Sequence, residues 1–156
     1  MIRKPPHPAP SSEDIQRFKT LHAASCTEFL AAVQSGVPAA SIAKLAVALD
    51  LPFATLSDAL DVPASTARRK ARNDEVLSPA QGERVLGLQK LIGQIQLMVE
   101  QGGDPTGFDV FGWTGRWLSK RVPALGGEYP LQYLRTIAGQ AALSDLLTRN
   151  ISGAYS

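Results

Sequence analysis

The sequence predicts an all-α protein, in which a helix-turn-helix unit is followed by a long helix and a small helical domain. Apolar residues recur at intervals of three and four along most of the 156-residue chain. Residues that begin and end helices separate these periodic segments, and strand-like alternation is absent. A hydrophobic content of 44% is enough for one compact core or for two small ones.

Composition divides the chain into four expected parts. The arm at 1–11 carries four prolines, which favour extended and solvated backbone, so we expect it to be disordered. Residues 12–77 contain the helix-turn-helix unit, 78–102 form a long connecting helix, and 103–156 form the C-terminal domain.

Several functional classes are disfavoured by the residues present. The formal net charge is only +2, so the total does not indicate a nucleic-acid partner. The soft metal donors His7, His22 and Cys26 are not spaced for a zinc site. We find no nucleophile motif, no carboxylate pair in an apolar context and no phosphate-binding loop. We therefore expect no enzyme activity, no catalytic residues, no metal and no cofactor.

Export and membrane insertion are not predicted either. Arg3 and Lys4 are followed by prolines, not by the apolar segment of a secretory signal. No uncharged apolar run approaches the roughly 20 residues that a spanning helix needs. Cys26 stands alone, which excludes an internal disulfide and fits a reducing compartment. We expect a cytoplasmic protein with no membrane partner.

A serine cap marks the start of the first helix. Ser11 or Ser12 can cap a first helix, and a second continues to Gly36-Val37-Pro38, which ends it. His22 lies on or beside the apolar face, where we expect it at the edge of the core rather than as a ligand.

The segment after Pro38 has the layout of a helix-turn-helix. We expect an amphipathic helix that ends near Pro52, a short helix at 55–60, a tight turn at 61–63 and a third helix at 65–73. The positions expected to face inward are Leu56, Leu60, Val62 and Ala67.

The third of these helices carries a dense cluster of positive charge. Four basic residues fall within five positions, and burial of Ala67 and Ala71 would turn the arginines outward. Arginine makes bidentate hydrogen bonds to guanine and to phosphate, and hydroxyls at a helix start can contact phosphate or base edges. The expected DNA-binding residues are Ser65, Thr66, Arg68, Arg69, Lys70 and Arg72.

The alternative interpretation of this cluster is a solvated basic face. Asp61 in the turn speaks for it, because a carboxylate beside a phosphate backbone is unfavourable. The short turn and the spacing of Ala67 and Ala71 indicate DNA binding, which is the interpretation that we favour.

The longest helix is expected to run from Pro79 to Gly102-Gly103. Ser78 caps it, and Gln81 completes a capping box. Three glycines interrupt it, each at a cost of about 1 kcal/mol relative to Ala. We infer that another helix approaches closely there, either from the same chain or from a second copy. The glycines are Gly82, Gly87 and Gly93.

An aromatic helix should follow, starting at Asp104-Pro105-Thr106. Trp113 and Trp117 are four apart and share a face, and core packing is the default interpretation over a ligand cage. The last helix is expected at 138–150, and the tail at 151–156 should follow it. The residues of this helix expected to face inward are Ala141, Ala142, Leu146 and Leu147.

A rigid, solvent-facing corner should join these helices. Pro123 ends the aromatic helix, Gly126 and Gly127 permit positive φ, and Pro130 suits the first turn of a new helix. Leu131, Leu134 and Ile137 then follow with helical spacing.

Motifs of the C-terminal half occur in an order that resembles the Xre/MbcA/ParS family of antitoxins. They are L-S-P at 77–79, R-W-L at 116–118, P-A-L-G-G at 123–127, P-L at 130–131 and the final G-Q-A-A-L-S-D-L-L-T-R-N-I-S-G-A-Y. The resemblance covers roughly residues 38–156 and is most specific from Arg116 to Tyr155.

The resemblance implies an all-helical, dimeric antitoxin with an Xre/Cro-like DNA-binding unit. Its N-terminal half would bind the promoter of its own operon through Arg68, Arg69 and Arg72. Its C-terminal half would cover the active site of a RES-domain toxin, a class related to ADP-ribosyltransferases that consumes NAD or transfers from it. The implied blocking residues are Arg149, Asn150, Ile151, Ser152, Gly153, Ala154, Tyr155 and Ser156.

We therefore expect the antitoxin of a type II toxin–antitoxin system, with a cognate RES-domain toxin and operator DNA as partners, acting as a homodimer. The alternative, from another class, is a stand-alone transcriptional repressor whose C-terminal domain senses a partner or a ligand. A toxin reading frame beside the gene would favour the first.

Overall fold

The computed structural model of the chain describes residues 11–154, with side chains to Arg149. The expected arm at 1–10 therefore lies outside the described residues, as do Tyr155 and Ser156. Of the two serines expected to cap the first helix, Ser11 does so: its side chain accepts a hydrogen bond from the Asp14 N–H at 3.2 Å. Within the described residues there is no strand, only two isolated bridges, so the all-α prediction is confirmed.

The helices follow the expected order. They are α1 (Ser12–Ala23), α2 (Cys26–Ser35), α3 (Ala40–Leu49), α4 (Phe53–Ala59), α5 (Ala64–Arg72), α6 (Pro79–Gly102), α7 (Val110–Leu118), the 3₁₀ helices η1 (Pro123–Leu125) and η2 (Pro130–Arg135), and α8 (Ile137–Ala154).

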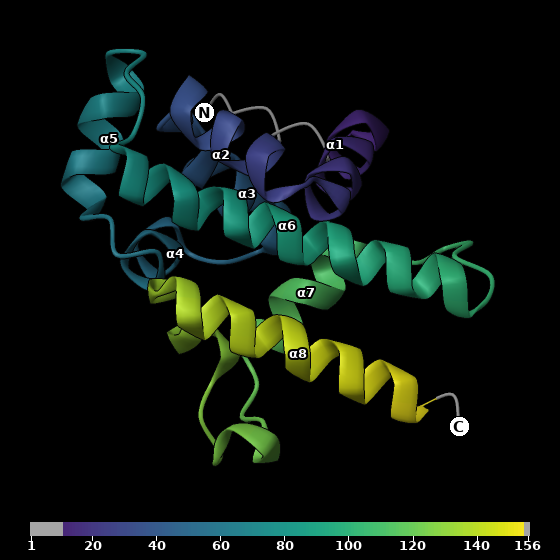
Figure 1. Cartoon of the computed structure of the whole chain (residues 1–156). Coiled ribbons are helices and arrows are strands. Elements are labelled where there is room, and N and C mark those ends of the chain that lie inside the picture. Colours follow the sequence, from purple (N-terminus) through teal and green to yellow (C-terminus); the bar gives the residue numbers. More distant parts are fainter. Residues whose placement is uncertain (1–10, 155–156) are drawn as a thin grey trace, which may run out of the picture.

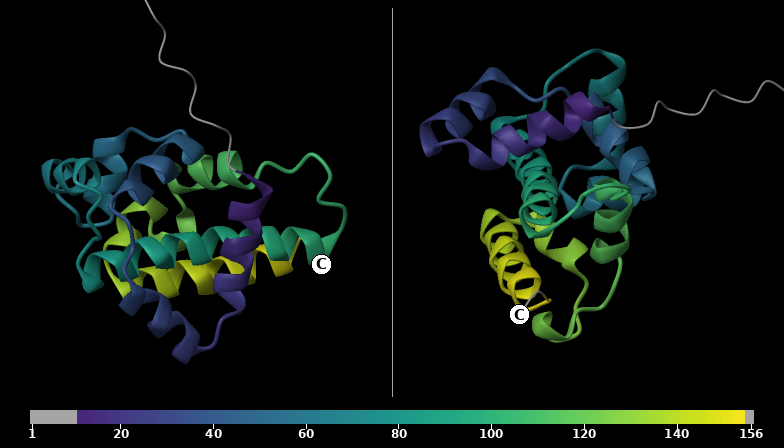
Figure 2. Two further views of the ribbon diagram at one scale, coloured as in Figure 1. Left: turned by 90° about the horizontal axis from the view of Figure 1, so that it is seen from above. Right: turned by 90° about the vertical axis from the view of Figure 1, so that its right-hand side faces the viewer.

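The long helix α6 runs through the middle of the molecule. Helices α1, α2 and α3 lie on one side of it, and α8 runs along the other side in the same direction (Figure 1). Helices α4 and α5 lie at the end where α6 begins, and the loop that carries η1 projects from the opposite face (Figures 1 and 2). Helix α6 therefore packs against helices of both halves of the chain.

The expected cap of α6 is confirmed. The Ser78 side chain accepts from the Gln81 N–H at 3.2 Å, and the Gln81 side chain accepts from the Ser78 N–H at the same distance. Helices α1 and α2 begin with the same kind of capping box. These reciprocal bonds satisfy amide groups that the first helical turn leaves without partners.

All three glycines of α6 that we singled out face segments of the same chain. A Cβ at Gly93 would overlap the carbonyl oxygen of Phe18 on α1, and a Cβ at Gly87 would overlap the side chain of Gln140 on α8. At Gly82 it would lie 3.0 Å from a methyl group of Val37. The close approach is therefore intramolecular, and the second copy that we considered is not needed to explain these glycines.

Both halves contribute to one continuous apolar core. Leu56, Leu60, Val62 and Ala67 of the helix-turn-helix are at most 1% exposed, as predicted. They join a cluster that runs along α6 and reaches Leu134 and Leu147 in the C-terminal half. His22 is half-buried at the end of α1, where burial, followed by the nearby charge of Lys90, lowers its pKa below the ordinary 6.5.

The start of the aromatic helix was predicted too early. Helix α7 begins at Val110, not at Asp104, because the Asp104 carboxylate accepts from the Thr106 N–H at 2.9 Å and closes a local turn. Gly107 then takes a φ of +77°, which ends any helical course. Asp109 is the actual cap, since it accepts from the Gly112 N–H at 3.0 Å.

The two tryptophans of α7 stack on each other. Their ring centroids are 6.1 Å apart with an angle of 13° between the planes, and Phe108 lies beside Trp113. Both indoles are half-buried against the main core, which agrees with the core interpretation.

The last helix also differs from the prediction. Helix α8 extends from Ile137 to Ala154, beyond the expected end at Asn150, because one glycine costs a helix only about 1 kcal/mol and no proline follows to stop it. Ala141 and Ala142 are exposed, contrary to expectation, although Leu146 and Leu147 are buried. The inward stripe is displaced because polar Gln140 is itself buried, at 6% exposure.

The helix expected to begin at Pro130 is shorter than its predicted spacing to Ile137 implies. The 3₁₀ helix η2 ends at Arg135, and Thr136 adopts an extended backbone. The Thr136 hydroxyl accepts from the Gly139 N–H at 2.9 Å, which begins α8 as a separate helix, and Ile137 is left 47% exposed.

No single helix within residues 11–154 is long and apolar enough to cross a membrane. Helices α3 and α4 meet that test only together, as a pair bent by 114°.

The crossing of α1 over α6 predicts a steep cost for Gly93→Ala. In an open helix this change would stabilise by about 1 kcal/mol, but here the new methyl group must displace the backbone of α1. We expect a net loss of about 1–3 kcal/mol in the free energy of unfolding, measured by urea denaturation.

Gly103→Ala is the matched control, because no atom lies within 4 Å of a Cβ at that glycine. Its stability should stay within about 0.5 kcal/mol of the wild type. Equal stability of the two variants would contradict the close contact.

Candidate functional site

Helix α5 exposes the arginines that the sequence singled out. Ala67 is fully buried, and Arg68, Arg69 and Arg72 are exposed. Of the other expected DNA-binding residues, Ser65 is exposed, and Thr66 and Lys70 are partly buried. The structure thus brings these six residues together on one short helix at the end of the molecule where α6 begins (Figure 1).

The exposed arginines differ in how firmly they are held. The guanidinium of Arg68 lies over the Phe53 ring of α4, 4.7 Å from its centroid. Such a cation–π contact orients the side chain without neutralising its charge. Arg69 lies 4.0 Å from the Glu75 carboxylate, at the outer limit of an ion pair between exposed groups. Both side chains therefore keep hydrogen-bond donors for a further partner.

The start of α5 differs from the starts of the capped helices. Pro63 stands at its N-cap position and makes no side-chain hydrogen bond to the helix. The first amide groups of a nine-residue helix therefore have no side-chain acceptor. Together with the helix dipole, such amides favour an anion, which is what a DNA backbone presents.

The turn between α4 and α5 is held internally by short hydrogen bonds. Asp61 takes a φ of +57°, which is uncommon for a residue other than glycine. The buried Ser57 hydroxyl donates to the Val62 carbonyl at 2.6 Å, and the Val62 N–H donates back to the Ser57 carbonyl at 2.9 Å.

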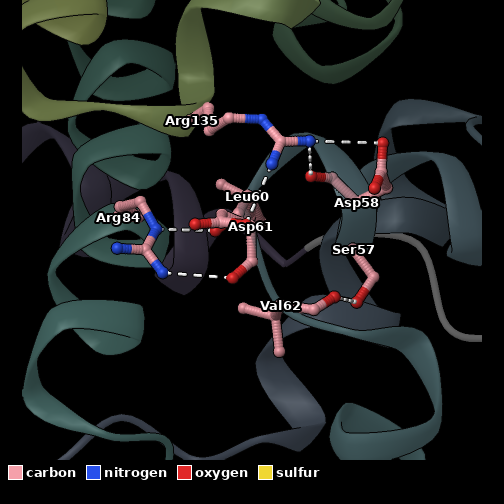
Figure 3. A network of polar contacts seen from close by, with 7 residues as sticks. All are labelled: Ser57, Asp58, Leu60, Asp61, Val62, Arg84 and Arg135. Atoms are coloured by element: carbon pink, nitrogen blue, oxygen red, sulfur yellow. Dashed lines mark hydrogen bonds and ion pairs between the residues drawn. The ribbon is translucent and has the colours of Figure 1, made fainter.

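Two arginines from outside α4 and α5 bond the same turn (Figure 3). Arg84 of α6 donates to the carbonyl of Leu60 at 2.7 Å and to that of Asp61 at 3.2 Å. Arg135 of η2 donates to the Asp61 carboxylate at 2.9 Å and to the Asp58 carbonyl at 3.0 Å. It also lies 3.5 Å from the Asp58 carboxylate.

These contacts reduce the repulsion that the Asp61 carboxylate would exert on a DNA backbone. Its carboxylate is paired with Arg135, so the turn presents no isolated negative charge. Sequence reasoning found neither arginine, because Arg135 is 74 positions from Asp61 and Arg84 is 24 positions from Leu60. No local pattern could connect residues so far apart.

The corner lies on a different face from α5. Pro123 and Pro130 begin the two 3₁₀ helices, and Gly126 and Gly127 have φ values of +67° and +81°. The Val122 N–H donates to the Glu128 carbonyl at 3.0 Å and closes the loop. The corner projects away from α5, on the side of α6 along which α8 runs (Figures 1 and 2).

The expected blocking tail is only partly described. Arg149 is exposed near the end of α8, and the backbone at 151–154 continues that helix instead of leaving it as a separate tail. The side chains of Asn150, Ile151, Ser152, Gly153 and Ala154 and the whole of Tyr155 and Ser156 lie outside what the structure describes. Within the described residues no group of three or more His, Cys, Asp or Glu side chains could hold a metal ion.

Comparison with known proteins assigns both halves. The model of the antitoxin Xre-like helix-turn-helix domain matches residues 28–90, which contain α5 and Arg84. The model of the antitoxin Xre/MbcA/ParS C-terminal toxin-binding domain matches residues 106–150, which contain the corner and Arg135. The Prs ADP-ribosylating antitoxin of Sphingobium sp. (strain YBL2) is 39% identical over 138 residues, 88% of this chain and 87% of that protein.

The chain belongs to the Xre/MbcA/ParS family of antitoxins. Both matched domains of this antitoxin are binding domains rather than catalytic ones, in keeping with the expectation that it is not an enzyme. The first match ends within α6 at residue 90, and the second begins at residue 106, ahead of α7. The toxin-binding match ends at residue 150, so residues 151–156 lie beyond it.

Proposed function

We propose that this antitoxin neutralises a cognate RES-domain toxin by covering its active site, and that it represses its own operon by binding operator DNA. The observation that carries the proposal is the order of the two matched domains, one with the exposed arginines of α5 and the other with the corner. The similarity to an ADP-ribosylating antitoxin supports a toxin of the NAD-consuming class. We place its site of action in the cytoplasm, where promoter DNA is accessible.

The toxin-binding match favours this proposal over a stand-alone repressor with a sensing domain. The corner and α8 lie on one side of α6, away from α5, so a bound toxin and bound DNA would not compete for the same residues (Figure 1). We propose that toxin contact extends from the corner at 123–130 along α8 to the residues at 149–156.

The exposed arginines of α5 provide the first test. Changing Arg68 and Arg69 together to Ala should abolish binding to the antitoxin's own promoter at moderate salt, because each lost contact is worth about 1–3 kcal/mol. Wild-type binding should also weaken steeply as salt rises, since neutralised phosphates release counterions. A gel-shift titration measures both effects.

The control removes two charges elsewhere, by changing the exposed Arg17 and Arg121 to Ala. This control should bind DNA nearly as well as the wild type, and the α5 double variant should still neutralise the toxin. Unchanged promoter binding by the α5 variant, with helicity intact by circular dichroism, would remove α5 from the proposal.

We also propose a homodimer, because one helix-turn-helix makes a small interface with DNA and two-fold dimers on palindromic sites are the usual solution. The glycines of α6 do not supply the dimer contact, since segments of the same chain cover them. Light scattering on the purified antitoxin at micromolar concentration should give twice the mass of one chain. A monomer in both the free and the DNA-bound forms would refute the dimer.

Truncation tests the end of the chain. Deleting 151–156 should leave the fold and promoter binding intact but restore toxicity when the toxin is co-expressed. The last turn of a terminal helix contributes little to a core, and an aromatic residue such as Tyr155 often dominates an interface. Tyr155→Ala alone should weaken neutralisation.

Deleting only Ser156 is the matched control and should neutralise fully. Growth of cells that carry the 151–156 deletion, at the wild-type rate under full toxin induction, would exclude this segment as the block. The corner at 123–130 would then be the next region to change.

A further inference from the structure

A buried amide on α8 connects three parts of the molecule. The side-chain nitrogen of Gln140 donates to the Arg84 carbonyl of α6 at 3.0 Å and to the Leu134 carbonyl of η2 at 3.0 Å. Gln140 is only 6% exposed, and α6 has glycine at the position that faces it. A buried amide with both donors satisfied fixes the relative positions of the segments that it joins.

Both acceptors of Gln140 stand at or next to an arginine that bonds the α4–α5 turn. One is the carbonyl of Arg84 itself, and the other is the carbonyl of Leu134, which directly precedes Arg135. Gln140 of α8 is therefore linked to the turn through the residues Arg84 of α6 and Leu134-Arg135 of η2. Figure 3 shows the last step, in which the two guanidinium groups bond the turn.

The two guanidinium groups suit the end of α4. The last carbonyl groups of a helix have no partner within the helix and carry partial negative charge, so arginine is a favourable partner there. Arg84 and Arg135 together bond the carbonyls of Asp58, Leu60 and Asp61. Pro63, at the start of α5, follows two residues after Asp61.

We propose that Arg135, with Arg84 and Gln140, acts as a positioning residue for DNA binding: it fixes the α4–α5 turn, and with it the start of α5, from within the toxin-binding domain. The inference rests on the proposed function in that α5 is the helix that binds the operator. In this role Arg135 acts through the turn and not by contact with DNA: its guanidinium lies 2.9 Å from the Asp61 carboxylate and 3.5 Å from that of Asp58.

This arrangement couples the two domains. A partner that moves α8 or η2 displaces the groups that hold the turn and so changes the DNA affinity of α5. By thermodynamic linkage, DNA on α5 changes the affinity of the toxin-binding domain by the same factor. The physical route is the pair of hydrogen bonds from Gln140 to the main chain at Arg84 and Leu134, followed by the bonds of the Arg84 and Arg135 side chains to the turn.

The first measurement is hydrogen–deuterium exchange in the free protein. The amides of Leu60, Asp61 and Val62 donate to carbonyls of α4, and their exchange reports how firmly the turn is held. We expect faster exchange over residues 56–63 in Arg135→Gln than in the wild type. Arg121→Gln, which removes the same charge from the same domain without a contact to the turn, should leave this exchange unchanged.

The second measurement is the affinity for a duplex of the antitoxin's own promoter, by fluorescence anisotropy at several salt concentrations. Arg135→Gln should weaken binding roughly tenfold, the size of effect that linked polar groups produce. The slope of log affinity against log salt should stay at the wild-type value.

The outcomes separate the inference from its alternatives. Unchanged exchange at the turn, or unchanged affinity despite faster exchange, overturns the positioning role. A salt slope reduced by about one means that Arg135 contacts phosphate directly, which also overturns it. If the wild type does not bind its promoter at all, the proposed autorepression fails, and the exchange experiment still decides whether Arg135 holds the turn.

Discussion

The contact between the backbone of α1 and Gly93 of α6 is the constraint on which the rest of the fold depends. Only a residue without a Cβ lets the Phe18 carbonyl lie against the long helix. Gly87 admits Gln140 of α8, and Gly82 admits Val37, by the same means. Glycine weakens an isolated helix, but here the packing of a separate segment against α6 offsets the cost of each glycine.

Polar side chains then determine how α8 lies on α6. Gln94 donates to the Ser144 carbonyl at 3.0 Å, and the Ser144 hydroxyl donates back to Gln94 at 2.8 Å. Gln140 adds its two bonds closer to the start of α8. Apolar packing would tolerate a small displacement of one helix along the other, but a buried amide would lose its partners. The polar pairs therefore specify one register between the domains.

Local signals in the sequence were sufficient to predict the order of the helices and the position of the helix-turn-helix. The serine capping boxes, the helix-turn-helix and the outward arginines of α5 depend on residues a few positions apart, and the structure has all of them. The errors have long-range or polar causes. The inward face of α8 was misplaced because a buried glutamine gives no apolar signal, and α7 was started too early because Asp104 closes a turn of its own. Arg135 could not be assigned to Asp61 because only the folded chain brings them together.

The low net charge of the chain is compatible with a DNA-binding role because charge acts locally. A formal charge of +2 leaves little general attraction for DNA, so the field near α5 must come from how charges are paired. Asp61, the carboxylate of the turn, is bound by Arg135 from the other domain. Glu75 lies 4.0 Å from Arg69, a loose pair between exposed groups that costs little to exchange for phosphate. Arg68 keeps its full charge over the Phe53 ring. The C-terminal domain thus removes the negative charge that would most oppose DNA, and α5 keeps its positive charge for the operator.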